Sequence, residues 1–170
     1  MNHEIHGIHG NGRERWSHRN PLSSVLRRQS FPLPITNFSR VEHVERVERL
    51  KELAAKVGQV AYGVHEYFGN GLLEKVYESA LAHRLEKSGF NVERQKPLKV
   101  FDADGFCVGD YFVDILVDGE LIVELKAAKA LAPEHLAQTL NYLKITGFPV
   151  GLLINFGSYK FERRTVTFST

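Results

Sequence analysis

The sequence predicts an α/β fold in which helices flank a mixed β-sheet, and three observations carry this prediction. Apolar residues recur at every third or fourth position over 41–68, which is the spacing of an amphipathic helix. Short apolar or alternating stretches between residues 92 and 168 are typical of strands. A strand, a helix and a strand follow one another over 120–156, which favours a right-handed crossover between parallel strands. We therefore expect the order ααβββαββ.

Two helices come first in this order. The periodic pattern begins at Val41 and stops at the Gly-Asn-Gly stretch 69–71, because glycine interrupts a helix. A second helix is expected from about Leu72 to Ser88. Gly89 suits the C-terminal end of that helix, where a left-handed residue is common.

Three strands come next. Residues 92–101 form the first, and Pro97 marks a bend or an edge position because proline cannot donate to the ladder of hydrogen bonds. Residues 106–117 and 120–127 form a hairpin around an Asp-Gly turn. Both hairpin strands are apolar on both faces, which is typical of strands in the middle of a sheet.

The last three elements complete the expected sheet. Pro133 suits the first turn of a third helix, which ends near Gly147. Residues 150–156 form a short, apolar, buried strand. Residues 160–168 alternate in polarity, so we expect an edge strand.

Length and composition predict one globular domain without internal disulfides or membrane spans. The chain has 170 residues, of which 43% are hydrophobic, and this is enough for one globular domain with its own core. Cys107 is the only cysteine, so no internal disulfide can form. No apolar run approaches the length of a membrane span, and the N-terminus lacks the apolar stretch of a secretory signal. We expect a cytoplasmic protein without a membrane partner.

Charge divides the chain into two parts. Residues 1–40 carry six Lys or Arg against two acids and have no sustained periodicity, so we expect a disordered or loosely packed basic tail. Residues 41–170 carry 16 basic against 18 acidic side chains and form the expected folded domain. A wholly basic domain would indicate a nucleic-acid partner by charge alone. Here any such function must rest on a site.

Three charged residues interrupt the apolar hairpin strands, namely Asp114, Glu124 and Lys126. A buried carboxylate is costly unless it is paired or binds a metal. Asp, Glu and one backbone carbonyl make an oxygen-only ligand set that suits Mg²⁺ or Mn²⁺. A lysine beside that metal can orient or help deprotonate an attacking water. The alternative is a buried Glu–Lys salt bridge, and these three residues alone do not decide between the two.

The length of the hairpin loop tests the metal hypothesis, because successive side chains of a strand point to opposite faces. A two-residue loop would pair Asp114 with Val123 and turn Glu124 away. A three-residue loop places Asp114 and Glu124 on one face. We therefore predict the three-residue loop, with Gly119 in the left-handed position of a type I turn that carries a G1 bulge.

Two helices add further candidates. Glu74 occupies position N3 of the second helix if Gly71 is its N-cap, where a carboxylate often caps the backbone; the alternative is a third acid at the metal. On the third helix, His135, Gln138 and Tyr142 fall within about 60° of one another beside the leucine face. That flank could overhang the site, or could be the polar shoulder of an ordinary amphipathic helix.

A family resemblance connects these motifs. Residues 71–77 read G-x-x-E-x-x-Y, and they are followed by GDYFVDILVDGELIVELKA, HLAQTLNYLK and GLLINFG. With these motifs the chain resembles the GxxExxY proteins, a bacterial group in the PD-(D/E)XK nuclease superfamily, over about residues 45–168. The resemblance implies a restriction-endonuclease-like core.

The resemblance also implies roles for single residues. Asp114 matches the aspartate of the PD half of the signature, although Val113 stands where the signature has proline. Glu124 and Lys126 match its E-x-K half, and Glu74 matches the helical acid that precedes them. Gln138 and Tyr142 match the Q-x-x-x-Y helix of related nucleases.

The expected function is therefore a Mg²⁺-dependent (or Mn²⁺-dependent) nuclease that hydrolyses DNA, which is a likelier substrate than RNA, in DNA processing or repair. Asp114, Glu124 and the Leu125 carbonyl would hold the metal, Glu74 would contact it through water, and Lys126 would position the attacking water. Gln138, Tyr142 and His135 would bind the substrate strand. The alternative is a catalytically silent nucleic-acid-binding or protein-interaction module on the same fold, which the near-neutral domain favours. A homodimer is possible in either case.

Overall fold

The computed structural model describes residues 40–168. Its elements are α2 (Arg40–Phe68), α3 (Glu74–Lys87), β1 (Val92–Phe101), β2 (Cys107–Val117), β3 (Leu121–Lys126), α4 (Pro133–Thr146), β4 (Val150–Asn155) and β5 (Glu162–Thr167). This is the predicted order ααβββαββ. Of the expected basic tail only Arg40 is described, as the first residue of α2, and the rest lies outside the described residues.

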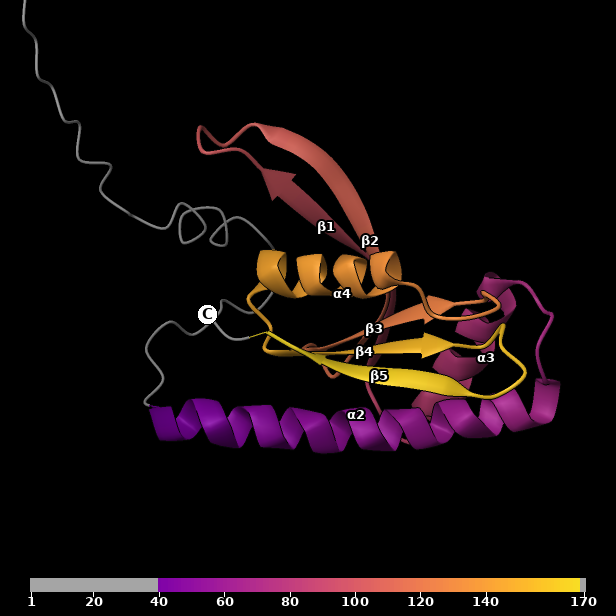
Figure 1. Ribbon diagram of the computed structural model, residues 1–170. Coiled ribbons are helices and arrows are strands. Elements are labelled where there is room, and N and C mark those ends of the chain that lie inside the picture. Colours follow the sequence, from indigo (N-terminus) through magenta and orange to yellow (C-terminus); the bar gives the residue numbers. More distant parts are fainter. Residues whose placement is uncertain (1–39, 169–170) are drawn as a thin grey trace, which may run out of the picture.

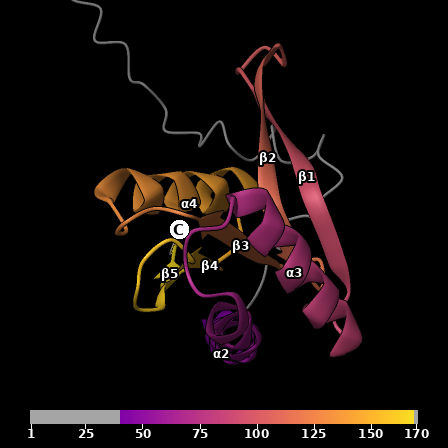
Figure 2. The same ribbon diagram turned by 90° about the vertical axis from the view of Figure 1, so that its right-hand side faces the viewer.

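The five strands form one mixed sheet in the order β1-β2-β3-β4-β5. The pair β3–β4 is parallel and the other three pairs are antiparallel, so α4 is the predicted crossover helix. Figure 1 shows α4 on one face of the sheet and α2 on the other, and Figure 2 shows α3 beside α2 on that second face. None of the helices described is long and apolar enough to cross a membrane.

The two faces of the sheet carry separate cores. The larger core joins α2 and α3 to the sheet, and its fully buried side chains include Leu50, Val57, Tyr77, Leu81, Ile115, Val123 and Phe156. The smaller core joins α4 to the other face and includes Leu98, Val113, Leu116, Ile122, Tyr142 and Phe148. Every residue of β4 is buried, as expected for a strand between two helical layers. β5 lies at one edge and β1, with Pro97, at the other, which confirms both edge predictions.

The hairpin of β1 and β2 extends beyond the rest of the sheet (Figures 1 and 2). β2 has eleven residues and β3 has six, so β3 pairs with β2 only near the turn. Tyr111 and Phe112 in the other half of β2 are 48% and 53% exposed. The expectation that β2 is buried on both faces is therefore wrong for this half, because no third strand or second helical layer within residues 40–168 covers it.

The loop between β2 and β3 has three residues, as the site requires. Val117 pairs with Leu121, which leaves residues 118–120 unpaired in the ladder. The predicted turn type is wrong, however. Asp118 has φ 52° as well as Gly119 with φ 73°, and a type I turn with a G1 bulge would have only the glycine in this region. Positive φ at both central residues is the pattern of a mirror-image turn.

Contacts from outside the hairpin explain this turn. The Asp118 N–H donates to the Asn91 carbonyl, and the Asp118 carboxylate accepts from the Asn91 N–H at 2.9 Å. The third loop residue, Glu120, accepts a bidentate pair of hydrogen bonds from Arg49 on α2. The loop is thus held at two residues, Asp118 by Asn91 and Glu120 by an ion pair with Arg49.

Candidate active site

Asp114, Glu124 and Lys126 come together where β2 separates from β3. The pairing of Ile115 with Val123 places Asp114 opposite Glu124. The Asp114 Oδ2 accepts a hydrogen bond from the backbone N–H of residue 125 at 2.8 Å. The Lys126 Nζ donates to Glu124 Oε1 at 2.6 Å. Two carboxylates and an ammonium group thus form one compact cluster at the carboxyl end of β3.

Glu124 is the most deeply buried acid of this cluster, with 2% of its surface exposed. Burial, followed by the charge of Asp114, raises the pKa of Glu124 to about 8, although the bond from Lys126 acts in the opposite direction. Among the residues that the structure describes, no donor reaches the buried Glu124 Oε2. An unpartnered buried carboxylate oxygen is rare in folded proteins, and such an oxygen can accept a bond from a water or bind an ion.

Asp114 lies at a twist in β2. Val113 and Leu116 both pack in the α4 core, although side chains three residues apart on a regular strand point to opposite faces. Opposite the twist, Gln95 in β1 has φ 49°, and its Nε2 donates to Asp114 Oδ1 at 3.3 Å. Burial is the largest influence on Asp114 and raises the pKa of its carboxyl. Asp114 is thus held at this irregularity between the Leu125 N–H and the Gln95 amide.

Glu74 closes the site from the α3 side. α3 begins at Glu74 itself with Leu73 as the N-cap, so the alternative in which Gly71 caps the helix and Glu74 is at N3 is wrong. Its Oε2 instead accepts a hydrogen bond from the N–H of Ala127 at 3.0 Å, directly after the E-x-K motif. The helix starts later than predicted because the chain before it is fixed by Tyr77.

Tyr77 explains the spacing of the G-x-x-E-x-x-Y motif. Its hydroxyl donates to the Gly69 carbonyl at 2.7 Å and accepts from the Leu72 N–H at 3.2 Å. Its ring stacks on Phe156 with the centroids 4.7 Å apart, so the side chain is fully buried. Tyr77 lies one helical turn after Glu74 and holds the preceding turn closed, which directs the Glu74 carboxylate to the end of β3.

The segment after β3 is also held from β4. Asn155 is fully buried, and its Oδ1 accepts from the N–H groups of Ala128 and Gly157, both at 3.0 Å. A Cβ on Gly157 would lie 2.3 Å from the Ala127 carbonyl carbon, so only glycine allows this approach. The sequence reasoning missed both residues. The only available clue was a polar asparagine at the end of an otherwise apolar strand.

The flank of α4 carries the three predicted substrate residues. The Gln138 Nε2 donates to the Tyr142 hydroxyl at 2.7 Å. Burial and the charge of Glu124 raise the pKa of Tyr142 to about 12. Tyr142 is 3% exposed and contacts Tyr111 edge to face. His135 is engaged at the start of its helix, where Nδ1 accepts from the Ala132 N–H at 3.1 Å.

A second buried acid, Glu78 on α3, was also missed from the sequence. It is 3% exposed and accepts hydrogen bonds from Lys75, from Arg94 Nε at 2.8 Å and from Gln95 Nε2 at 2.8 Å. The same Gln95 amide reaches Asp114. Sequence reasoning had no access to this network because its members come from a helix and two strands.

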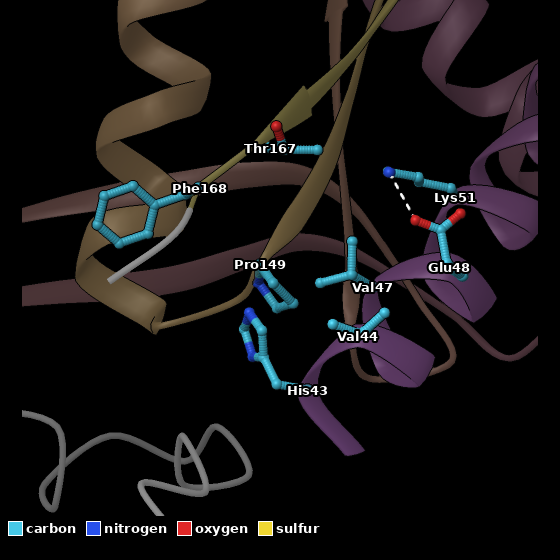
Figure 3. Close-up of a pocket in the computed structure, with 8 residues that line it drawn as sticks. All are labelled: His43, Val44, Val47, Glu48, Lys51, Pro149, Thr167 and Phe168. Atoms are coloured by element: carbon cyan, nitrogen blue, oxygen red, sulfur yellow. Dashed lines mark hydrogen bonds and ion pairs between the residues drawn. The ribbon is translucent and has the colours of Figure 1, made fainter. Parts of the chain in front are cut away.

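A hollow of about 270 Å³ lies elsewhere, between the first turns of α2 and the start of β4 (Figure 3). Figure 3 shows Val44, Val47 and Pro149 along its wall, with Lys51 paired to Glu48 at 2.8 Å. None of the predicted site residues lines it. It therefore does not belong to the candidate active site.

The cluster fits a divalent cation in its chemistry. Asp114 and Glu124 offer carboxylate oxygens, and one of them lacks a partner. The Leu125 N–H points to Asp114, and the carbonyl of a strand residue points to the same side as its N–H. Hard oxygen donors of this kind suit Mg²⁺ or Mn²⁺. Within residues 40–168, no group of three His, Cys, Asp or Glu side chains is arranged to hold a metal.

Comparison with known proteins gives one match. A family profile described as the PD-(D/E)XK nuclease superfamily matches residues 51–166, which is more than half of the chain. No curated protein and no solved structure matches significantly. The match covers β1 to β4, all of β5 except Thr167, the site cluster and α4. The chain therefore belongs to the PD-(D/E)XK nuclease superfamily.

Proposed function

We propose that this protein is a Mg²⁺- or Mn²⁺-dependent nuclease of the GxxExxY group that hydrolyses phosphodiester bonds in DNA, in DNA processing or repair. The observation that carries the proposal is the buried Glu124 Oε2, which has no hydrogen-bond donor among the described residues and faces the same cluster as Asp114. Most buried carboxylate oxygens in folded proteins have a hydrogen-bond partner. Superfamily membership supports the reaction class.

The metal would be held by Asp114, by Glu124 and by the Leu125 carbonyl, with Glu74 contacting it through water. When bound, the metal supplies Lewis acidity toward a phosphate oxygen and lowers the pKa of a water ligand. Glu124 must be ionised to bind, and the cation opposes the burial that keeps it protonated. The bond from the Leu125 N–H fixes one Asp114 oxygen and orients the other.

Lys126 would act on the attacking water, and Glu74 would hold the segment at the end of β3. The Lys126 side chain is 14% exposed and its ammonium donates to Glu124, so this residue lies at the boundary between the buried cluster and solvent. In that place it can orient the attacking water and offset phosphate charge. Glu74 holds the Ala127 N–H, which limits motion of the segment that carries Lys126.

The flank of α4 supports a substrate role for Gln138. Its amide is oriented by the buried Tyr142 hydroxyl, and His135 is held at the first turn of the same helix. In this arrangement Tyr142 acts mainly by fixing Gln138, because its ring is buried. Gln138 is then the group best placed to contact a phosphate or a base at the site.

One observation favours a second candidate, a catalytically silent nucleic-acid-binding or interaction module on the same fold. The described residues gather two carboxylates rather than three at the cluster, and the folded domain carries slightly more acids than bases. A DNA channel usually needs more Lys and Arg. Homodimer formation and a cytoplasmic location stay predictions under either function.

Cleavage assays separate the two candidates. Wild-type protein is incubated with single-stranded, double-stranded and branched DNA and with RNA, in the presence of Mg²⁺, Mn²⁺ or EDTA. We expect metal-dependent cleavage of DNA, which Glu124→Ala and Lys126→Ala abolish. If the wild-type protein and both variants are equally inert on every substrate, the binding-module function is correct.

Metal-dependent thermal stabilisation is a measurement that does not require turnover. Because the cation binds only the folded cluster, Mg²⁺ or Mn²⁺ at about 100 times its dissociation constant should stabilise the protein by about 2.7 kcal/mol. Asp114→Ala should abolish the shift of the melting temperature. A shift that survives in this variant would place the metal elsewhere.

A further inference from the structure

Gln95 occupies a backbone conformation that its residue type rarely adopts. Its φ is 49°, in the left-handed region where glycine and asparagine are favoured. It lies in the middle of β1, between Arg94 and Lys96, at one of two places where the ladder with β2 is irregular. Such conformations persist where the surrounding structure holds them, and they concentrate at functional sites.

The Gln95 amide joins two carboxylates that belong to different parts of the molecule. Its Nε2 donates to Glu78 Oε2 at 2.8 Å and to Asp114 Oδ1 at 3.3 Å. Glu78 is itself fixed on α3, because Lys75 and Arg94 also donate to it. The chain of contacts therefore runs from a buried anchor, through one neutral amide, to the predicted metal ligand.

The neutral charge of the amide matters for the site. A lysine or arginine at this place would pair with Asp114 and weaken its attraction for a cation. An amide donor orients a carboxylate without removing its charge. Hydrogen bonds of this kind to the ligands of a metal typically change its affinity by about 10- to 100-fold.

We propose that Gln95 is a positioning residue, which holds the Asp114 carboxylate against the fixed Glu78 in the orientation that a divalent cation requires. This inference rests on the proposed metal-dependent function. It extends that function by a residue outside the family's signature motifs. It also explains why a strand carries a non-glycine residue at positive φ opposite Asp114.

The test separates the side chain from the backbone. Gln95→Gly removes the amide but suits the positive φ, so a purely conformational role would leave the variant unharmed or more stable. We expect Mn²⁺ affinity, measured by isothermal titration calorimetry, to fall by about 10- to 100-fold. Asp118→Gly is the matched control, because it changes the other non-glycine residue at positive φ, with φ 52°, away from the cluster. Its Mn²⁺ affinity should match that of the wild type.

Recovery of the cleavage rate at saturating Mn²⁺ distinguishes a positioning residue from a catalytic residue. At saturating Mn²⁺, Gln95→Gly should recover most of the wild-type cleavage rate, because the ligand itself is intact. Asp114→Ala should not recover. Mn²⁺ binding by Gln95→Gly within twofold of the wild type would overturn the inference.

A metal-free measurement keeps the inference testable if the proposed function fails. Urea unfolding of Gln95→Gly, Asp114→Ala and the double variant forms a double-mutant cycle. We expect the shifts of the unfolding midpoint to be non-additive, because the two side chains are hydrogen-bonded. Additive shifts would refute the contact, whereas a wild-type protein that binds no Mn²⁺ but shows coupling would refute only the metal-dependent function.

Discussion

Glu78 and Glu124 are buried to nearly the same extent, with 3% and 2% of their surface exposed, yet their surroundings differ. Glu78 accepts hydrogen bonds on both oxygens, from Lys75, Arg94 and Gln95. Glu124 accepts one from Lys126 on Oε1, and no described donor reaches Oε2. Both oxygens of the buried Glu78 carboxylate are thus hydrogen-bonded to described residues, whereas only one oxygen of the Glu124 carboxylate is.

This difference separates a carboxylate that stabilises the fold from one that is kept for a ligand. Removal of a partner from a fully bonded buried acid leaves charges or donors unsatisfied, and the fold loses stability. A buried acid with an unpaired oxygen already lowers the stability of the fold, so its presence at this position points to function. The two residues should therefore respond in opposite ways to the same substitution.

The largest expected effect is that of the substitution Glu124→Gln on metal-dependent cleavage. The amide has nearly the same size but lacks the charge that a divalent cation requires, so metal-dependent cleavage should fall on the order of 10³-fold. Stability should stay unchanged or rise, because a poorly solvated acid is removed. Initial cleavage rates and urea unfolding measure the two parts. Unimpaired cleavage would remove Glu124 from the site.

Glu78→Gln should show the opposite response. The new NH₂ group replaces one of the two oxygens and so faces the donor from either Arg94 or Gln95, and we expect a loss of roughly 2 kcal/mol in the free energy of unfolding. Metal affinity should fall less than in Gln95→Gly, because the amide oxygen still accepts one bond. Urea unfolding without metal gives the first quantity. A variant as stable as the wild type would show that Glu78 is not an anchor.

The pH dependence of stability sharpens the comparison. The pKa of Glu124 is raised from 4.5 to about 8 in the folded protein, so the folded state binds this proton more tightly than the unfolded chain. Its contribution to stability is greatest below about pH 4.5 and is lost as the pH rises toward 8, by up to about 1.4 kcal/mol per pH unit. Urea unfolding of the metal-free protein across this range measures the slope. Glu124→Gln should remove this part of the slope, and Glu78→Gln should retain it.

The smallest effect is expected at Glu120, an acid near the protein surface. Its ion pair with Arg49 is partly exposed, so Glu120→Gln should cost less than about 1 kcal/mol. The three-residue loop should persist, because Asp118 is held separately by Asn91. Cleavage rates within twofold of the wild type would confirm this. A large loss of activity would show that the ion pair sets the register of the site.

Much of the fold followed from local patterns. The periodicity over α2, the apolar β4 and the alternating β5 depend on neighbouring residues, so the order of elements and both edge strands were predicted correctly. The three-residue loop was also correct, and it had been predicted from the requirement that Asp114 and Glu124 lie on one face. The start of α3 was not, since Tyr77 binds the chain before the helix and delays its beginning to Glu74.

The sequence by itself determined that Asp114, Glu124 and Lys126 are charged residues in apolar strands, because burial of charge is unfavourable wherever the strand lies. Only the tertiary structure decided how they are supported. The anchoring of Asp114 by Gln95, and of Gln95 by Glu78, joins side chains from β2, β1 and α3. Hydrogen bonds between segments distant along the chain leave no periodic trace in it, and they exist only once the helix has packed on the sheet.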